Sequence, residues 1–509
     1  MKSLLTITVF IFSTTLSAQN VTLSTPQGDL IGKLASTNDA VRIFLGIPYA
    51  APPVASARWK PPVIPESWTG ERMATDYGPN CMQEPYPKGS FFYRPARLSS
   101  EDCLYLNVWT SAHLNEKRPV MVWIHGGALT RGSGARATYD GSNLAQKGIV
   151  VVTINYRLGV FGYFAHPELI SESPNEAAGN YGLLDQVRAL EWVQDNIAAF
   201  GGDPDNVTIF GESAGSWSVN LLSASPLAKG LFHKAIGESG ARLDPRMTLS
   251  EATKDGSDLA AALGAGFIAD MRAVSAQQLL SAATSYRFRA DGIVDGWSIP
   301  DQPYSIFASG RQNKVPVLTG YNAEEGTTLG LLSRIPANND VYISRMQDMY
   351  GDLFSEFLEI YPVNDLRKAT LDSYRDSGFG WNSITWARMT ANVGENAYLY
   401  FFSHQPPGPQ IKNLGAFHAA EIAYVFNNPQ ALRNTATNED IQMADLMSDY
   451  WVNFASTGNP NAKGLPEWKP YTQLNPNYVE LNVTATPYTD LTPAAWDFFD
   501  KVEANKRNY

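Results

Sequence analysis

Residues 207–215 read VTIFGESAG and give the strongest indication of the fold. Its first four residues are apolar or β-branched, which predicts a buried strand. The other five match the pattern G-x-S-x-G, in which a serine occupies a sharp turn between a strand and a helix. Small residues are needed two positions before and after that serine because the turn is crowded. The context therefore predicts Ser213 as a nucleophile raised above the end of a strand.

A similar pattern, GESGA, follows at residues 237–241. Its second glycine stands at the wrong offset for the same turn. We therefore expect Ser239 to have a supporting role and not to be the nucleophile.

The segments around this turn alternate between two hydrophobic patterns. Residues 120–124 (VMVWI) and 150–154 (VVVTI) are continuously apolar or β-branched, as in strands buried on both faces. Apolar residues recur at helical spacing from Leu183 to Phe200, and Gly201 provides a stop. Alternating strands and helices predict an α/β fold with a central, mostly parallel sheet covered by helices on both faces. Ligands bind such sheets at the carboxyl ends of the strands.

A serine nucleophile needs a base, a group that orients the base, and donors for the oxyanion. Residues 123–128 read WIHGGA and end a predicted strand with a glycine-rich loop. Backbone N–H groups in such a loop can approach a developing negative charge closely, since no side chain intervenes.

Beyond these patterns, the sequence resembles the type-B carboxylesterases of the α/β-hydrolase fold. That family includes carboxylesterases, cholinesterases and bacterial p-nitrobenzyl esterases. The resemblance extends over most of the chain, and the motifs that carry it are GIPYA (46–50), EDCLYLN (101–107), NYRLG (155–159), FGGDP (200–204), YWVNF (450–454) and TGNPN (457–461).

The resemblance implies the rest of the site. The family's acid precedes a glycine after a strand, which points to Glu325, and its histidine follows Gly-x-x, which points to His418. The order Ser, acid, His along the chain is that of α/β-hydrolases. The implied oxyanion donors are the backbone N–H groups of Gly127, Ala128 and Ala214.

Ala128, Ala419 and Glu324 lie at or next to the implied site residues. Many relatives have glycine where this chain has Ala128 and Ala419, but neither alanine removes a catalytic group. Glu324 is adjacent to the implied acid, and we expect it to be a solvated neighbour that catalysis does not need.

Other residues have open roles. Glu421 and Ser239 resemble a network that some relatives place behind the histidine, while Trp217 either lines the acyl pocket or packs the helix after the nucleophile. Residues 91–93 (FFY) lie on a segment that can rim the gorge in this family, but residues of this kind more often pack than contact a substrate. The remaining histidines that we expect to be surface or structural residues are His113, His166, His233 and His404.

Composition excludes several classes of protein. Hydrophobic residues make up 44% and charged residues 17%, as in a globular protein with a large core. With 39 basic and 50 acidic residues the net charge is −11, which argues against a nucleic-acid partner. The histidines form no HExxH motif, and we predict neither a metal nor another cofactor.

The chain has two cysteines, Cys81 and Cys103. Their spacing alone permits either a bridge or two free thiols, whereas the resemblance implies the N-terminal disulfide of the family.

Residues 1–18 have a basic start, an apolar run and a small-residue cleavage site, as in a signal peptide. We expect residues 19–509 to form a single α/β-hydrolase domain that is secreted or periplasmic and has no stable membrane anchor. The oligomeric state stays open.

These features predict an enzyme that hydrolyses small-molecule carboxylic esters through a serine acyl-enzyme. One alternative is a non-catalytic, neuroligin-like adhesion protein, and another is an acyltransferase or peptidase that uses the same triad. The sequence does not identify the natural ester.

Overall fold

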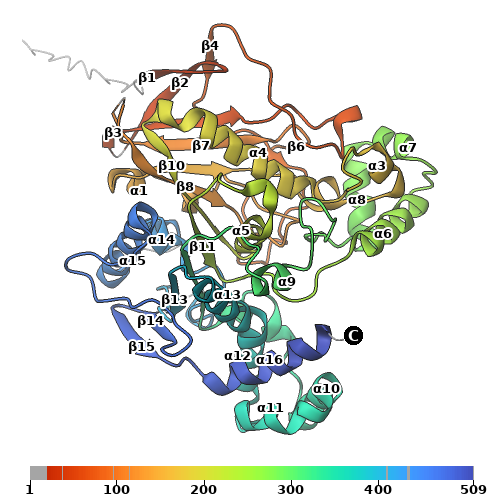
Figure 1. The fold of residues 1–509 in the computed structure, drawn as a ribbon, viewed down its shortest axis with the longest axis vertical. Helices are drawn as coiled ribbons and strands as arrows, with labels where there is room; N and C mark the ends of the chain where they lie inside the picture. Colours follow the sequence, from red (N-terminus) through yellow and green to blue (C-terminus); the bar gives the residue numbers. More distant parts are fainter. Residues whose placement is uncertain are drawn as a thin grey trace, which may run out of the picture.

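A 13-stranded sheet runs through the protein in the computed structural model, with β1 and β2 towards one end and β14 and β15 towards the other (Figure 1). The structure describes residues 20–36, 38–95, 97–113, 115–408, 411–432 and 436–507, so the predicted signal peptide lies outside the described residues. In spatial order the strands are β1 (Asn20–Thr25), β2 (Gly28–Ala35), β3 (Asn38–Pro48), β7 (Tyr105–Thr110), β9 (Val150–Ile154), β8 (Arg118–Ile124), β10 (Gly202–Glu212), β11 (Lys234–Glu238), β12 (Val317–Asn322), β13 (Ala397–Phe402), β14 (Asn477–Leu481) and β15 (Ala485–Thr489), with β4 (Glu71–Met73) beside β2.

Strand direction divides the sheet into a parallel centre and antiparallel edges. From β9 through β8 and β10 to β14, every pair of neighbours is parallel. The strands β1, β2, β3 and β7 pair antiparallel at one edge, and β15 pairs antiparallel with β14 at the other. The predicted mostly parallel sheet is confirmed, and the antiparallel edges are an addition that the sequence patterns did not reveal.

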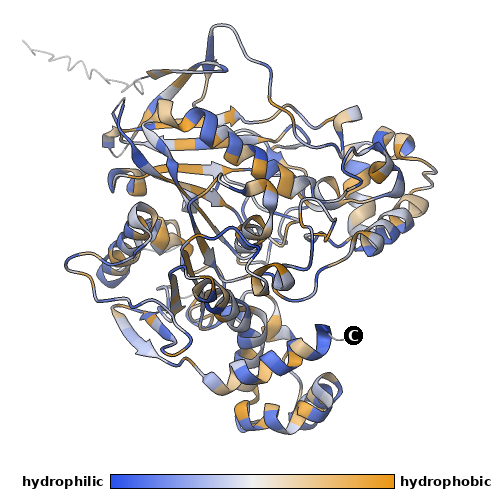
Figure 2. Ribbon diagram, in the orientation of Figure 1, coloured by the Kyte–Doolittle hydropathy of each residue, from blue (hydrophilic) through white to orange (hydrophobic). Residues whose placement is uncertain are grey.

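Helices cover both faces of this sheet because its central strands are apolar on both sides. In β8, Val120 and Val122 face the core that contains α4, α5 and α13, whereas Met121 and Trp123 face the core that contains α1, α14 and α15. Figure 2 shows the helices striped with hydrophobic and hydrophilic residues, as expected when one side of each helix packs inwards. The helices are α1 (Ser142–Gln146), α2 (Gly159–Tyr163), α3 (Pro167–Glu172), α4 (Tyr181–Asn196), α5 (Ala214–Ala224), α6 (Leu249–Ala262), α7 (Ile268–Ala273), α8 (Ala276–Tyr286), α9 (Pro303–Ala308), α10 (Asn339–Tyr350), α11 (Phe354–Ile360), α12 (Leu366–Arg375), α13 (Trp381–Asn392), α14 (Ile422–Val425), α15 (Asn438–Thr457) and α16 (Pro493–Arg507).

The elements predicted around Ser213 are present. The strands predicted at 120–124, 150–154 and 207–210 lie within β8, β9 and β10, and the predicted helix corresponds to α4 and a 3₁₀ turn at Ile197–Phe200. Gly201 ends that turn with a φ of 80°, the left-handed conformation that favours glycine.

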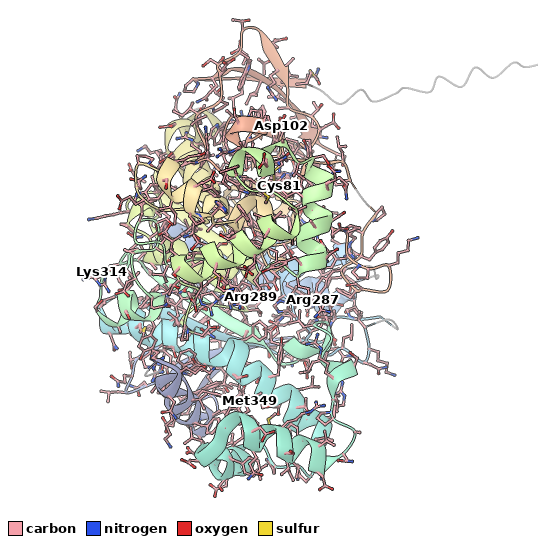
Figure 3. All side chains as sticks on the ribbon, turned by 90° about the vertical axis from the view of Figure 1, so that its right-hand side faces the viewer. Cys81, Asp102, Arg287, Arg289, Lys314 and Met349 are labelled. Carbon is pink, nitrogen blue, oxygen red and sulfur yellow. A yellow bond between two sulfur atoms is a disulfide. The ribbon has the colours of Figure 1, made fainter. Side chains whose placement is uncertain are left out.

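Arg287 and Arg289 are exposed side chains on the segment that follows α8 (Figure 3).

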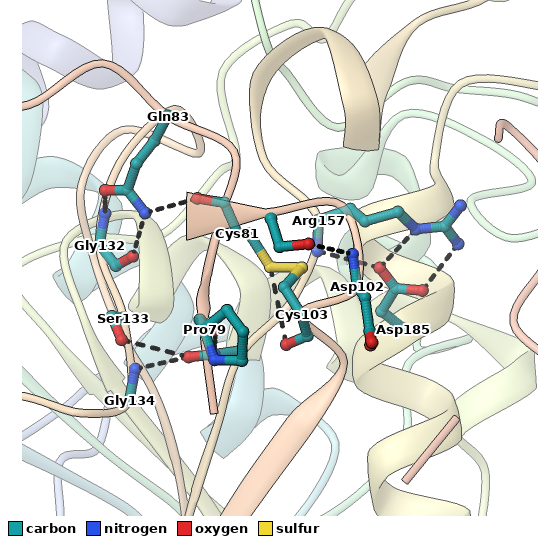
Figure 4. The surroundings of a disulfide bond; sticks show 12 residues. Pro79, Cys81, Gln83, Asp102, Cys103, Gly132, Ser133, Gly134, Arg157 and Asp185 are labelled. Atoms are coloured by element: carbon teal, nitrogen blue, oxygen red, sulfur yellow. Dashed lines mark hydrogen bonds and ion pairs between the residues drawn. A yellow bond between two sulfur atoms is a disulfide. The ribbon is translucent and has the colours of Figure 1, made fainter. Parts of the chain in front are cut away.

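Cys81 and Cys103 form the implied disulfide, with their Cα atoms 4.9 Å apart (Figure 4). The closed loop between them is held beside the segment that follows β8. The amide of Gln83 donates to the carbonyl of Gly132 and accepts from its N–H, and it also donates to the carbonyl of Cys81. The bridge therefore anchors a loop that contacts the chain just beyond the predicted oxyanion segment.

Within the described residues, every helix is too short or too polar to span a lipid bilayer.

Candidate active site

Ser213 stands at the carboxyl end of β10 and begins the turn into α5. Its backbone has a φ of 54° and a ψ of −122°, a strained conformation for a residue with a side chain. A Cβ at Gly215 would lie 2.0 Å from the carbonyl oxygen of Ile124, and one at Gly211 would lie 2.6 Å from the same atom. The two glycines of the motif therefore allow β8 and the turn to approach closely, as the pattern predicts.

The hydroxyl of Ser213 faces a cavity. Ser213 is half-buried and lines a hollow of about 270 Å³ together with Gly126, Gly127, Ala128 and His418. No described residue forms a hydrogen bond with its hydroxyl. Phe91 and Phe92 also line this cavity, whereas Tyr93 does not.

His418 and Glu325 form a close pair in the interior. Nδ1 of His418 lies 2.5 Å from Oε2 of Glu325, and both side chains are buried. The second oxygen of Glu325 accepts the N–H of Asn322, the last residue of β12, at 2.8 Å. Two anchored oxygens fix the carboxylate, which in turn fixes the orientation of the imidazole.

Glu212 was not predicted as part of the site, yet it approaches the other nitrogen of the imidazole. Its Oε1 lies 3.1 Å from Nε2 of His418, which is ion-pair distance, but no hydrogen bond to this oxygen is made by any described residue. A carboxylate directly before the serine, at the end of a strand, is the one signal in the sequence that marks it. The imidazole therefore lies between two carboxyl groups, with Glu325 at Nδ1 and Glu212 at Nε2.

The two carboxylates change the protonation of His418. Burial disfavours the imidazolium and lowers the pKa, but the charges of Glu212 and Glu325 outweigh burial and raise the pKa of His418 to about 9. Burial also raises the pKa of Glu212 to about 7, against the attraction of His418. The site thus favours a positively charged imidazole held between two carboxyl groups.

Glu324 differs from the expectation of a solvated neighbour. It is half-buried, and its Oε2 accepts the N–H of Ala416 at 2.7 Å. Burial raises the pKa of this carboxyl group. The description as solvated was wrong because the loop that carries His418 folds over Glu324, although its carboxylate turns towards Ala416 and not towards the imidazole.

Ser239 and Glu421 lie together, as the family network implies. The hydroxyl of Ser239 donates to Oε1 of Glu421 at 3.3 Å, and the amide of Asn322 donates to Oε2 at 2.5 Å. Ser239 follows β11 as Ser213 follows β10, and its φ of 53° is similar, but it is fully buried and does not line the cavity.

Backbone donors lie beside Ser213. The N–H groups of Gly127 and Ala128 have no hydrogen-bond acceptor among the described residues, and Ala214 is the first residue of α5, where no intrahelical acceptor exists. Gly127 and Ala128 line the same cavity as Ser213. These three N–H groups are thus available to an oxyanion.

The two alanines that replace family glycines both have left-handed backbones. The φ of Ala128 is 55° and that of Ala419 is 71°. Glycine adopts this region without the steric cost that a Cβ adds, which explains why many relatives have glycine there.

The other residues with open roles lie outside the cavity. Trp217 packs under Arg242, whose guanidinium carbon is 4.0 Å from the ring centroid, and does not line the cavity. The other histidines have structural partners or exposure: His404 pairs with Asp440, His233 accepts from Val207, His166 caps α3 and His113 is exposed. No group of three or more potential ligands positioned to hold a metal ion occurs in the part of the chain that the structure describes.

Comparison with known proteins gives a consistent set of matches. Residues 19–499 match the model of the carboxylesterase family. The chain is 39% identical over 455 residues to the fumonisin B1 esterase of Sphingopyxis macrogoltabida, covering 86% of this chain and 83% of the relative. It is 36% identical to mouse carboxylesterase 1F, covering 95% of this chain and 94% of the relative.

Solved structures of similar fold are also esterases. The carboxylesterase of Geobacillus stearothermophilus superposes with a TM-score of 0.83 at 34% identity, covering 94% of this chain and 99% of that one. A PNB esterase superposes with a TM-score of 0.80 at the same identity and coverage.

Proposed function

Because the chain belongs to the carboxylesterase family and is a carboxylic ester hydrolase, we propose that it cleaves esters through an acyl-enzyme on Ser213, with His418 as base and Glu325 as orienting acid. The observation that carries this proposal is the close pair of His418 and Glu325 beside the strained turn that presents Ser213 to a cavity. Small-molecule esters are the expected substrates, and the reaction requires no cofactor.

The chemistry follows from these groups. Neutral His418 takes the proton of Ser213 through Nε2 while the serine oxygen attacks the ester carbonyl. The carbonyl oxygen becomes negative and is stabilised by the N–H groups of Gly127, Ala128 and Ala214. The alcohol leaves with the proton from His418, and water then repeats the sequence on the acyl-enzyme.

Glu325 supports the base in two ways. Its bond to Nδ1 keeps the proton on that nitrogen, so that Nε2 is the one able to accept. Its charge also stabilises the imidazolium that forms during attack. Because Nε2 lies near Glu212 in the structure, the imidazole must turn towards Ser213, or lose the proton that Glu212 favours, before it acts as base.

The test is a pre-steady-state burst. Mixing the enzyme with p-nitrophenyl acetate should release one equivalent of p-nitrophenol per active site quickly, followed by slower turnover. Quenching with acid during the burst should leave an acetyl group on the peptide that contains Ser213. Acetylation of another residue, or turnover with no acylated peptide, would count against the proposal, and a protein with no turnover of any ester would favour the adhesion alternative.

We also propose that residues 1–18 are removed on export and that residues 19–509 form one domain in a secreted or periplasmic enzyme. The match of the family model from residue 19 supports the boundary, and a disulfide suits an oxidising compartment. The intact mass of the exported protein tests the cleavage site, since it should correspond to a chain that begins at Gln19.

A further inference from the structure

Two cavities meet at the candidate active site. The cavity that contains Ser213 adjoins a second one of about 290 Å³. Their linings share Tyr86, Phe92, Arg94, Arg136 and Thr138. A substrate that occupies the first cavity therefore has room to extend into the second.

The linings of these cavities are rich in arginine. The side chains of Arg94, Arg131 and Arg136 line the first cavity, and those of Arg94, Arg97 and Arg136 line the second. Among the described residues, Glu212 is the only carboxylate on either lining. The protein as a whole has 39 basic and 50 acidic residues, so the charge of this region is opposite to that of the molecule.

Arg131 and Arg136 are placed by one aromatic ring. Their guanidinium carbons lie 5.4 and 5.6 Å from the centroid of Tyr86, which is close enough for cation–π attraction. Nε of Arg131 also donates to the carbonyl of Glu84 at 3.1 Å. Tyr86 lies in the loop closed by the disulfide, so the bridge helps to position these cations.

Neither guanidinium forms an ion pair with a carboxylate of the described residues. Both side chains are half-buried. Burial raises the pKa of Glu212, which lines the same cavity, and the charge of Arg136 opposes this rise, but the two side chains are not at ion-pair distance. Buried arginines elsewhere are paired: Arg58 with Glu101, and Arg157 with Asp185. Partly desolvated cations that lack an ion-pair partner in the protein favour an anionic ligand, because a guanidinium binds a carboxylate through two parallel hydrogen bonds.

We propose that this enzyme prefers esters that carry a free carboxylate, and that Arg131 and Arg136 bind it. The proposal rests on the proposed function, since the ester bond must reach Ser213. Arg94 and Arg97 extend the positive surface into the second cavity, where a longer or multiply charged substrate fits. The carboxylate belongs either to the acyl chain or to the alcohol, and the experiment separates these two positions.

The test compares matched pairs of esters. For the acyl side, mono-p-nitrophenyl adipate is compared with p-nitrophenyl hexanoate, which has a methyl group in place of the carboxylate. For the alcohol side, 4-carboxyphenyl hexanoate is compared with 4-acetylphenyl hexanoate. The quantity measured is the ratio of kcat/KM for the charged ester to that for the neutral ester, after subtraction of the rate without enzyme.

In one of the two arms, Arg136→Gln should lower this ratio by about tenfold, since a hydrogen-bonded charge contributes more than a neutral contact. Arg131→Gln should lower it in the same arm, and Arg136→Lys should lower it less because the charge remains. The arm that responds identifies the side that carries the carboxylate. The wild-type ratio should also fall as salt is added, because the attraction is screened.

The matched control is Arg289→Gln, which removes the same charge from an exposed residue outside both cavities (Figure 3). It should leave both ratios unchanged. Thermal unfolding of each variant checks that the fold survives, and inhibition of hexanoate hydrolysis by adipate measures carboxylate binding without turnover of a charged ester. Ratios that stay at the wild-type value in both arms, with unchanged inhibition by adipate, would overturn the proposal. Failure of the wild type to hydrolyse the neutral esters would instead contradict the proposed function.

Discussion

Replacing Glu212 by glutamine should move the pH dependence of the enzyme to lower pH. As the proposed base, His418 acts only when it is neutral, so we expect kcat/KM to be lost as the pH falls below the pKa of its imidazolium. That pKa is raised to about 9, with burial opposing and the carboxylates of Glu212 and Glu325 prevailing. Glutamine keeps the shape of the side chain and removes its charge, so the imidazolium loses one of the two groups that stabilise it.

The distance sets the size of the shift. At the 3.1 Å between Oε1 of Glu212 and Nε2 of His418, Coulomb's law with the dielectric constant of water gives about 1.3 kcal/mol, or about one pKa unit. The interior screens less than water, so this value is a lower bound, and an opposite charge so close typically shifts a pKa by about one to three units. The acidic limb should therefore move from a midpoint near 9 to one between about 6 and 8.

The assay is the pH profile of kcat/KM for a neutral ester, which reports the ionisation of the free enzyme. Acid release should be followed in a pH-stat so that the ionisation of a chromophore does not distort the profile. Glu324→Gln is the matched control, since Glu324 is not among the groups that raise the pKa of His418. An acidic limb that stays in place for Glu212→Gln, or moves to higher pH, would refute the reasoning.

Three further predictions concern single residues. Ser213→Ala should lower kcat by about 10⁶, because the triad acts as a unit, and Ser239→Ala should lower kcat far less. Comparable losses of kcat in steady-state kinetics would contradict the assignment of the nucleophile to the turn after β10. Glu325→Gln should lower kcat by about 10⁴ with little change in Tm. Glu324→Gln should keep most activity because glutamine still accepts the N–H of Ala416. The reverse pattern would assign the role of the orienting acid to Glu324. Ala128→Gly should raise the free energy of unfolding by about 0.5 to 1 kcal/mol, since the left-handed backbone at φ 55° strains an alanine and its methyl group is exposed. Denaturant titration measures this free energy, and a less stable variant would speak against strain at this position.

The central part of the fold could be predicted because local patterns and tertiary packing agree there. The segments within β8, β9 and β10 are buried on both faces, so their sequences are continuously apolar, and that pattern identifies a parallel sheet. The turn at Ser213 could be located because its crowding excludes large residues, which leaves glycine at two positions. The antiparallel strands at the edges pair through short turns between neighbouring segments. Strands such as β1 and β15 are partly exposed, so their sequences lack the continuous apolar run that identifies a strand buried on both faces.

The candidate site could be predicted in part. Glu325 and His418 came from the resemblance, and the distance between them agrees with that pairing. Spacing alone does not select them, since the four helices α10 to α13 and the strand β13 lie between the two in sequence. The environment of Glu324 could not be predicted, because its burial depends on how the loop before His418 folds over it. Sequence motifs identified the candidate site residues, and only the three-dimensional structure shows which side chains contact them.

The neighbours of Glu212, Arg131 and Arg136 also could not be predicted from the sequence. Glu212 is part of the motif at Ser213, yet a motif does not state which atom of the imidazole a carboxylate approaches. Arg131 and Arg136 belong to a segment whose side-chain directions depend on Tyr86, which reaches them from the disulfide-closed loop. The backbone conformation around Ser213 and the positions of the Arg131 and Arg136 side chains therefore depend on different parts of the chain. We therefore expect a change in the loop from residue 81 to 103 to alter which esters bind while the proposed catalytic groups stay in place. This separation is the reason why the reaction is easier to infer from the sequence than the substrate.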